Sequence, residues 1–510
     1  MELIFFLSLF LIFYIILIKM LSKPIRKNSR LKLPPGPKPL PIIGNIHKLF
    51  GSQLHLMLRD LAGRYGPLMH LKLGEISTII VTSPEMAKEI YKTNDMLFAS
   101  RPNHHVAFKI ISYDFTDLAF APYGNHWRQL RKICTVELLS RNRVQAFKSI
   151  REEEVFNLVK SIHSQKGSII NISKSLFSLG YGITGCIAFG KKDRNTEKYI
   201  QLIEEIIKLT SGFSLADMYP SVKLLQVLSI TRYKTEIAHK QVDEILENIL
   251  KDHKEKLLKE ANQASTEETK ENIVDVLLKI QKRGDFDPEL TDTIIKAVIF
   301  DIFSAGSETW STTMEWAISE IIKNPVVMKR AQDEVRNVFD EKGNVDESSL
   351  HELKYLGAII KETLRLHPSA PLLLPRECSE QCEINGYQIP AKSRVLVNAW
   401  AMGRDPMYWI DAEKFNPDRF LDSELDYKGN NYEYIPFGSG RRICPGISYA
   451  QANIELLLAQ LLFHFDWKLP GELKQDQLDM TENFGVSMRR KNDLHLILDP
   501  YHCSGFNKNY

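Results

Sequence analysis

The stretch that decides the fold reads Phe437-Gly438-Ser439-Gly440-Arg441-Arg442-Ile443-Cys444-Pro445-Gly446. It is a glycine-rich turn that presents one cysteine just before an apolar helical run over residues 447–463. The positive end of a helix and nearby amide groups favour a thiolate over a thiol. Glycines let the backbone approach a flat ligand closely, and Arg442 could pair with a carboxylate of that ligand. A reactive cysteine without a metal is the alternative interpretation of this turn.

A second segment, Ala305-Gly306-Ser307-Glu308-Thr309, lies inside a helical run that we expect over residues 292–322. Gly306 in a helix interior costs about 1 kcal/mol relative to alanine, which indicates that something needs the space. Glu308 and Thr309 place an acid and a hydroxyl group beside that gap. Taken alone, the segment is also compatible with a glycine packing contact and a capping-type threonine.

Two residue pairs have helical spacing. Trp127 and Arg131 lie one turn apart on the same face, and Glu362 and Arg365 can form an ion pair at i and i+3. By themselves, the pairs do not distinguish a functional site from an ordinary core tryptophan and a surface ion pair.

Together, these segments resemble the cytochrome P-450 family. Residues 437–446 match its heme-binding motif F-x-x-G-x-R-x-C-x-G at every fixed position, and residues 305–309 match its A/G-G-x-[D/E]-T oxygen-binding segment. The resemblance implies a mainly α fold with a small β portion, and heme b with Cys444 as the axial iron ligand. It also implies that Glu308 and Thr309 relay protons to dioxygen. The other cofactor-binding residues that it implies are Trp127, Arg131, Arg376, Phe437, Arg442 and Gly446.

The same resemblance implies a buried cluster of Glu362, Arg365 and Arg419. Residues 415–420 resemble the family's P-E-R-F segment but carry Asp418 in place of glutamate, which leaves Arg419 intact. The cluster would lock the heme-side core, and its role would be structural rather than catalytic.

The N-terminus predicts a membrane anchor. Residues 1–18 are almost wholly apolar, and a helix of that length barely spans a hydrocarbon layer of about 30 Å. The basic stretch that follows contains no acid and should stay in the cytosol. A cleaved signal peptide is the alternative, but the start carries Glu2 and no cleavage pattern follows. We expect a single-pass protein of the endoplasmic reticulum with the anchor at residues 1–18, a basic and proline-rich hinge at 19–40, a catalytic body at 41–500 facing the cytosol, and a tail at 501–510.

Other classes of protein fit less well. A net charge of +3 gives no argument for nucleic-acid binding. Cys378 and Cys382 have no second cysteine pair with which to bind zinc, so we interpret them as ordinary loop thiols. Residues 180–185 read G-x-G-x-x-G, but no convincing buried strand precedes them and no βαβ unit surrounds them, which disfavours a nicotinamide dehydrogenase. A non-catalytic heme-binding protein would not need the acid–threonine pair.

The resemblance covers the chain from end to end and points to plant A-type members of specialised metabolism. It implies dioxygen as co-substrate and electrons from NADPH through a separate NADPH–cytochrome P-450 reductase, because the chain carries no flavin or nicotinamide module. Arg128, Lys132 and Arg441 could offer that reductase a basic face. Membrane lipid is the other expected partner.

The implied substrate pocket is mostly apolar, which favours a hydrophobic substrate. We therefore predict hydroxylation of a terpenoid, with alkaloid or phenolic oxidation by the same chemistry as the alternative. Asp114 and Asp117 keep the alkaloid alternative open, because a carboxylate could pair with an amine. The implied pocket residues are 102–120, Ile302, Ala305, 370–374 and 484–486.

Overall fold

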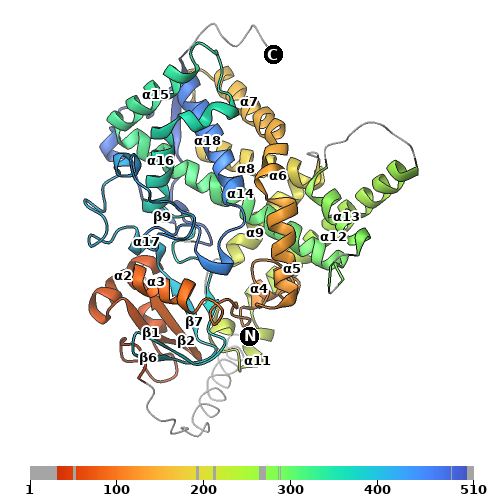
Figure 1. Cartoon of the computed structure of the whole chain (residues 1–510), viewed down its shortest axis with the longest axis vertical. Coiled ribbons are helices and arrows are strands. Elements are labelled where there is room, and N and C mark those ends of the chain that lie inside the picture. Colours follow the sequence, from red (N-terminus) through yellow and green to blue (C-terminus); the bar gives the residue numbers. More distant parts are fainter. Residues whose placement is uncertain are drawn as a thin grey trace, which may run out of the picture.

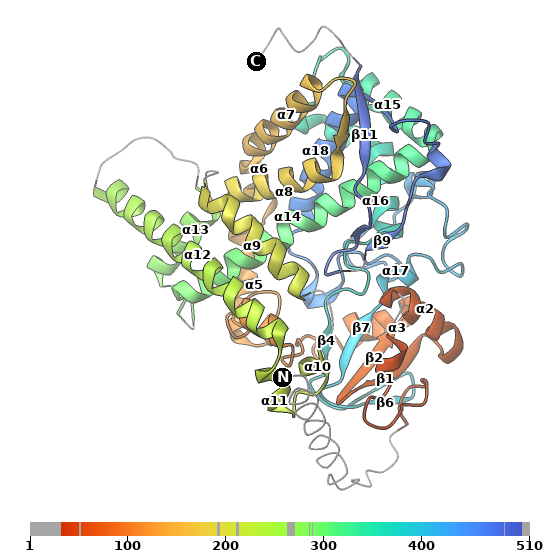
Figure 2. The same ribbon diagram turned by 180° about the vertical axis from the view of Figure 1, so that it is seen from behind.

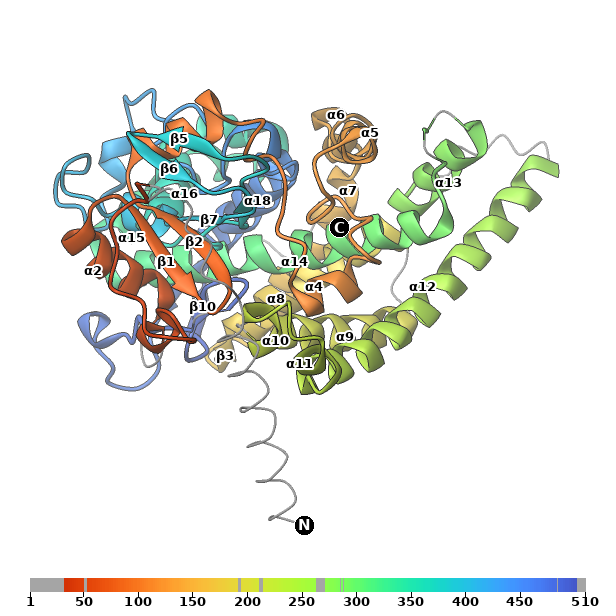
Figure 3. The same cartoon turned by 90° about the horizontal axis from the view of Figure 1, so that it is seen from below.

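The computed structural model describes residues 32–49, 53–190, 194–210, 214–262, 271–284, 286–287, 289–483 and 485–501. Helices form most of this part of the chain, and the main strands lie in a smaller region beside α2 (Leu54–Tyr65) and α3 (Pro84–Lys88) (Figure 1, Figure 2). Seen from below, this region lies on one side and α12 (Ile230–Asn262) and α13 (Ile273–Arg283) lie on the other (Figure 3). The predicted mainly α fold with a small β portion is confirmed.

Helix α14 (Asp292–Lys323) runs through the middle of the helical part and packs against α8 (Ile172–Phe189), α16 (Lys354–Leu366) and α18 (Ile447–His464). The Oγ1 atom of Thr291 caps its start by accepting a hydrogen bond of 3.3 Å from the amide of Ile294. Its second half is buried on nearly every face, which explains why apolar residues surround it instead of forming one stripe.

The other helices are shorter or lie around this centre. Their bounds are α4 Val106–Ile111, α5 Asn125–Ile133, α6 Arg141–Ala146, α7 Lys148–Ser164, α9 Arg194–Thr210, α10 Leu215–Met218, α11 Lys223–Val227, α15 Pro325–Phe339 and α17 Ala399–Met402.

The largest sheet has the strand order β1-β2-β7-β4, in which β1 and β2 are antiparallel, β2 and β7 parallel, and β7 and β4 antiparallel. The antiparallel strands β1 (Leu68–Leu73) and β2 (Ile76–Val81) form a hairpin. The other strands are β3 Ile169–Asn171, β4 Arg376–Glu377, β5 Cys382–Ile384, β6 Tyr387–Ile389, β7 Arg394–Val397, β8 Phe465–Lys468, β9 Glu482–Asn483, β10 Arg489–Arg490 and β11 His495–Pro500.

The G-x-G-x-x-G stretch lies inside α8 and serves helix packing. A Cβ atom at Gly180 would lie 2.7 Å from the carbonyl oxygen of Ser307 on α14. Only glycine permits this approach of the two backbones. The stretch has no nucleotide-binding loop geometry, in agreement with its interpretation as a helix contact.

Among the described residues, no helix combines the length and apolar character that crossing a bilayer requires. The predicted anchor at residues 1–18 and most of the basic part of the hinge lie outside the described residues.

Candidate heme site

The glycine-rich turn holds Cys444 three residues before α18 begins. The amide of Cys444 donates to the carbonyl oxygen of Phe437 at 3.0 Å, which closes the turn, and the amide of Gly446 donates to Cys444 Sγ at 3.4 Å. Gly440 has a φ of +70°, and a Cβ atom there would lie 2.6 Å from a carboxylate oxygen of Asp95. Glycine is therefore required at this position both for the backbone angle and for space.

The surroundings of Cys444 act on its thiol in two directions. Burial raises the pKa of Cys444, whereas the Gly446 amide and the Arg131 guanidinium lower it. In the described part of the chain, no group of three or more His, Cys, Asp or Glu side chains could hold a metal ion. A metal at Cys444 must therefore bring most of its own ligands, and an iron porphyrin does so.

Four arginines surround this turn: Arg101, Arg131, Arg376 and Arg442. Arg442 donates from Nε to the carbonyl of Ala99 at 2.8 Å, and Arg376 donates from Nη2 to the carbonyl of Ser439 at 3.0 Å. Arg101 donates from Nη1 to the carbonyls of Leu374 and Pro375 at 2.9 and 2.8 Å. The guanidinium of Arg131 has no hydrogen bond or ion pair with any residue that the structure describes.

None of the four guanidinium groups forms an ion pair within the described ranges. Burial lowers the pKa of all four, and repulsion from neighbouring arginines lowers it further at Arg101, Arg376 and Arg442; the pKa of Arg442 falls to about 9. Buried cations without counter-ions are costly, by several kcal/mol each. The cluster therefore needs an anionic ligand, and the two propionates of heme fit that requirement.

Trp127 and Arg442 belong to one packed unit. The indole Nε1 of Trp127 donates to the carbonyl oxygen of Leu118 at 3.0 Å. The guanidinium carbon of Arg442 lies 4.1 Å from the centroid of a Trp127 ring, a cation–π distance. Trp127 thus holds Arg442 in position, while its own N–H is donated to the backbone.

Glu308 and Thr309 are consecutive on α14 but have different partners. Arg489 Nε donates to Glu308 Oε1 at 2.8 Å, and the hydroxyl of Ser487 donates to the same oxygen. Thr309 Oγ1 donates to the carbonyl of Ala305, 2.8 Å away on the same helix. The Ser369 hydroxyl donates to the carbonyl of Thr309 at 2.9 Å. Ser487 and Arg489 are therefore tied to the acid, and Ser369 to the threonine backbone.

Comparison with known proteins decides the family. The family model described as Cytochrome P450 matches residues 34–497. The chain belongs to the cytochrome P450 family. It is 58% identical to tabersonine 16-hydroxylase 2 of Catharanthus roseus and 55% identical to tabersonine 6,7-epoxidase isoform 1 of the same plant, with 100% and 99% of each pair of chains covered. A zebrafish cytochrome P450 structure with abiraterone superposes with a TM-score of 0.72 at 25% identity, covering 88% of this chain and 100% of that chain.

This P450 is therefore a heme-thiolate monooxygenase, and the predicted cofactor, heme with an iron–thiolate bond, is confirmed. The relatives correct one prediction. Their names refer to an alkaloid, so they give no support to the predicted terpenoid substrate and favour the alkaloid alternative.

The P450 also contains the expected cluster of Glu362, Arg365 and Arg419. Arg365 donates from Nε and Nη2 to the two carboxylate oxygens of Glu362, both at 2.7 Å, and Arg419 Nε donates to Glu362 Oε1 at 3.0 Å. The side chains of Glu362 and Arg365 are fully buried. Asp418 instead pairs with Arg330 at the surface at 2.6 Å, so its replacement of glutamate leaves the cluster unaffected.

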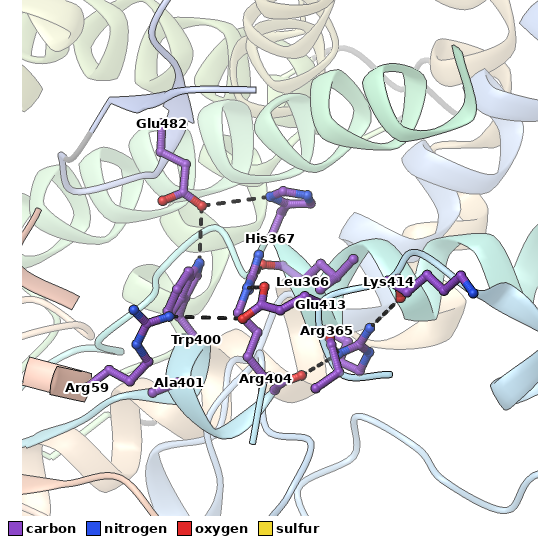
Figure 4. Close-up of polar contacts among 12 residues, drawn as sticks. Arg59, Arg365, Leu366, His367, Trp400, Ala401, Arg404, Glu413, Lys414 and Glu482 are labelled. Atoms are coloured by element: carbon purple, nitrogen blue, oxygen red, sulfur yellow. Dashed lines mark hydrogen bonds and ion pairs between the residues drawn. The ribbon is translucent and has the colours of Figure 1, made fainter. Parts of the chain in front are cut away.

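A neighbouring network anchors the hairpin that carries the partners of Glu308 (Figure 4). Trp400 Nε1 donates to Glu482 Oε1 at 3.1 Å, and His367 Nδ1 lies 3.9 Å from the same oxygen. His55 Nε2 lies 2.8 Å from the other oxygen. Glu482 begins the β9–β10 hairpin, so three side chains from distant parts of the chain fix the start of this hairpin.

Sequence reasoning missed two features of the site. The first is Arg101, a buried residue that joins the arginine cluster. Its signal in the sequence was weak: an arginine directly before Pro102. The second feature is a carboxyl pair, Asp117 and Asp301. Asp301 Oδ2 accepts from the amides of Leu118 and Ala119 at 2.8 and 2.9 Å.

The remaining predicted pocket residues are distributed as follows. The rings of Phe108 and Phe120 stack with centroids 4.2 Å apart. Asp114 is exposed and lies near Lys109, at 3.4 Å, while Asp117 is buried and accepts from the amide of Phe120. Neither acid is therefore offered to a substrate amine in this arrangement. Phe484 lies outside the described residues.

Proposed function

We propose that this P450 inserts one atom of dioxygen into an alkaloid related to tabersonine. The support comes from relatives of more than half identity over almost the whole chain, two of which are named as a tabersonine hydroxylase and a tabersonine epoxidase. Both reactions transfer one oxygen atom, so the proposal covers hydroxylation and epoxidation of this substrate class.

In this proposal, Cys444 provides the axial thiolate, and Arg131, Arg376, Arg442 and Arg101 bind the propionates. One observation supports the assignment most strongly: four buried or half-buried guanidinium groups surround the cysteine turn without a counter-ion among the described residues. When bound, heme supplies the reductive activation of dioxygen and the transfer of one oxygen atom to the substrate.

The acid and the hydroxyl group of α14 are assigned to proton delivery. Thr309 presents a hydroxyl whose own proton is donated to the carbonyl of Ala305, so its oxygen can accept a proton from a donor nearby. Glu308 is held by Ser487 and Arg489 through one carboxylate oxygen. Phe437 and Gly446 belong to the turn itself, where they set the position of Cys444 through its amide and its sulfur.

The aromatic stack of the 106–120 segment suits an alkaloid better than a fixed carboxylate would. Phe108 lies between His105, at a centroid distance of 4.0 Å, and Phe120, at 4.2 Å. Flat ring systems pack against such faces without a charge partner. We assign recognition of the alkaloid to apolar and aromatic contact, and the amine-pairing role that the sequence suggested for Asp114 and Asp117 is dropped.

The membrane assignment has support from the described surface. Large apolar side chains are exposed on α10, α11 and the first turns of α12, which lie together in Figure 3. They are Leu215, Leu224, Val227, Leu228, Ile230 and Tyr233. Such a patch suits a lipid surface. We propose that it rests on the endoplasmic reticulum membrane beside the anchor at residues 1–18, with the body at 41–500 receiving electrons from NADPH–cytochrome P450 reductase.

The test uses full-length protein in microsomes with NADPH and the reductase. The reduced, carbon monoxide-bound difference spectrum should show the red-shifted Soret band of thiolate-ligated heme, and Cys444→Ala should abolish it. Cys186→Ala is the matched control, since Cys186 is also half-buried but lies away from the turn, and it should keep the band.

Substrate class is tested with the same membranes. Tabersonine should be converted to a product that is heavier by one oxygen atom, while a sesquiterpene hydrocarbon should not react. Conversion of the terpenoid but not of the alkaloid would overturn the substrate proposal and leave the heme assignment standing. Loss of the Soret band in the wild-type protein would overturn the heme assignment instead.

A further inference from the structure

Two cysteines that the heme site does not use lie side by side beyond β4. Cys378 directly follows β4, and Cys382 is the first residue of β5. Their Sγ atoms are 3.7 Å apart. The sequence suggested two ordinary loop thiols, but the structure brings them into contact.

The backbone holds the two thiols together. The amide of Cys378 donates to the carbonyl of Ser393 at 2.9 Å, and the carbonyl of Cys378 accepts from the amide of Lys392 at 2.7 Å. Cys382 pairs with Ile389 in the two-stranded sheet of β5 and β6. The turn between the cysteines is also tied down, because the amide of Ser379 donates to the carbonyl of Leu97 at 2.8 Å. Their proximity therefore follows from the fold and not from a flexible side chain.

The two thiols are not equivalent. Cys378 is completely buried, whereas Cys382 is half-buried and reachable by a small reagent. Cys378 Sγ donates to the carbonyl of Glu380 at 2.8 Å. The contact between the two sulfurs lowers the pKa of Cys382, and the same contact, together with burial, raises the pKa of Cys378. Cys382 is thus the nucleophile of the pair, and Cys378 is a protonated thiol beside it.

A metal site does not account for the pair. Zinc would require further ligands, and among the residues that the structure describes no group of three or more suitable side chains exists. Neither Cys134 nor Cys444 takes part in a disulfide, so neither competes for these two thiols.

We propose that Cys378 and Cys382 form a peroxide-sensitive dithiol, a site of reversible oxidation separate from the heme. The Cys382 thiolate attacks one oxygen of hydrogen peroxide and breaks the O–O bond, which gives a sulfenic acid and hydroxide. The hydroxide takes up the proton that the Cys382 thiol had released and becomes water. The sulfur of Cys378 then attacks the Cys382 sulfur, the S–O bond breaks, and the Cys378 proton leaves with the hydroxyl group as a second water.

In total, two thiols and one hydrogen peroxide give one disulfide and two waters. The sulfurs must close from 3.7 Å to about 2.05 Å. The site lies two residues beyond Arg376, whose guanidinium is bonded to the carbonyl of Ser439 in the cysteine turn. Oxidation therefore closes a short loop directly behind one of the heme-site arginines, without involving Cys444.

The chain suits a direct measurement. Trypsin cleaves after Arg376 and Lys392, and the peptide of residues 377–392 contains Cys378, Cys382 and no other cysteine. Fully reduced holoenzyme is treated with stoichiometric hydrogen peroxide, free thiols are alkylated, and the peptides are weighed. The 377–392 peptide should appear unalkylated and lighter by two hydrogen atoms, at a rate at least ~10-fold above thiol loss at Cys134 or Cys186. A reductant should then restore two alkylation sites.

Two variants distinguish the roles of the sulfurs. In Cys378→Ser, peroxide should leave a sulfenic acid on Cys382 that a dimedone-type reagent traps, because the resolving thiol is missing. In Cys382→Ser, Cys378 should remain unmodified. A trivalent phenylarsenical, which bridges neighbouring thiols, should bind the wild-type 377–392 segment and neither variant.

The wild-type measurement needs no variant, so misfolding of a variant leaves the proposal testable. The reduced carbon monoxide spectrum, recorded before and after peroxide, ensures that the heme site has survived. The proposal would be overturned if Cys378 and Cys382 were alkylated to the same extent before and after peroxide, or if peroxide oxidised them no faster than Cys134. A disulfide that links either cysteine to another part of the chain would also overturn it.

Discussion

Asp117→Asn should stabilise the enzyme by an amount that grows as the pH rises above the ordinary carboxyl pKa of 3.8. Asp117 and Asp301 lie together between the 106–120 segment and α14, and burial is the main cause that raises the pKa of both. The pKa of Asp301 reaches about 6, and repulsion from Asp301 adds to the rise at Asp117. One proton is therefore shared between two carboxyl groups that would otherwise repel each other.

The direction of the pH effect follows from this rise. The folded state retains a proton that the unfolded state releases near its ordinary carboxyl pKa of 3.8. The stabilising contribution is present below that value and is lost as the pH rises through about 6. A rise of about two pKa units corresponds to roughly 3 kcal/mol, since one unit is 1.36 kcal/mol.

A loss of the same kind applies at Asp117, whose pKa is raised by burial and by repulsion from Asp301, and Asp117→Asn should remove it. The asparagine Oδ1 can still accept from the amide of Phe120, at 3.0 Å in the wild type, and its Nδ2 can donate to Asp301 in place of the shared proton. The variant gives up the attraction of Asp117 for Arg101 and Arg442, which offsets part of the gain. We expect a net gain of about 1–3 kcal/mol near pH 8 and about half as much near pH 5, because the loss begins at the ordinary carboxyl pKa and is only about half complete at that pH.

The measurement is the midpoint of thermal loss of the heme–thiolate band of the full-length enzyme. For 510 residues, unfolding entropy is about 1 kcal/mol per degree, so the variant should gain about 1–3 °C near pH 8 and about half as much near pH 5. Asp114→Asn is the matched control from the same segment, with a side chain that is 75% exposed, and should show no difference at either pH. A gain for Asp117→Asn that is the same at both pH values, or a loss that grows with pH, would refute the reasoning.

Three further substitutions test other parts of the site. Arg101→Ala should release heme as readily as Arg376→Ala, because each substitution removes one cation of the same cluster. The heme-to-protein ratio of the purified variants measures this loss. A full heme content in Arg101→Ala would exclude Arg101 from the site. Thr309→Ala should retain the Soret band while NADPH is consumed without product and hydrogen peroxide accumulates, and fully coupled turnover would remove the proton role. Glu362→Gln should cost about 3–5 kcal/mol in stability, since it breaks a fully buried ion pair, as read from thermal midpoints. Asp418→Asn, in the surface pair with Arg330, should cost no more than about 1 kcal/mol.

The local features of the fold could be predicted because their causes are local. The helix expected over residues 292–322 is observed as Asp292–Lys323, since its cap, its glycine and its long apolar run are all read within one segment. The turn that holds Cys444 could also be predicted locally. Gly440 has a positive φ and lies close to Asp95, and the glycine itself is visible in the sequence. The cluster of Glu362, Arg365 and Arg419 was expected from the resemblance, and the short spacing of the first two made their contact plausible on physical grounds.

The long-range contacts of the site could not be predicted in this way. Asp117 and Asp301 are 184 positions apart, and only the packing of the loop onto α14 makes them a pair. Arg101 joins the other arginines from a separate segment for the same reason. Cys378 and Cys382 are close in sequence, but their contact depends on hydrogen bonds to residues 392–393 that sequence spacing does not reveal.

Glu308 illustrates how one side chain can serve both structure and chemistry. Ser487 and Arg489 donate to the same oxygen, Oε1, and within the described residues no donor reaches Oε2. An acid held through one oxygen keeps its position on α14, and in the proposed function its other oxygen exchanges the proton. The donors come from the hairpin whose start is fixed by Glu482, and the neighbouring residues 485–486 belong to the implied substrate pocket. If Glu308 and Thr309 deliver protons as proposed, a substrate that displaced this hairpin would also shift the acid next to Thr309 and so would link the fit of the substrate to the delivery of protons.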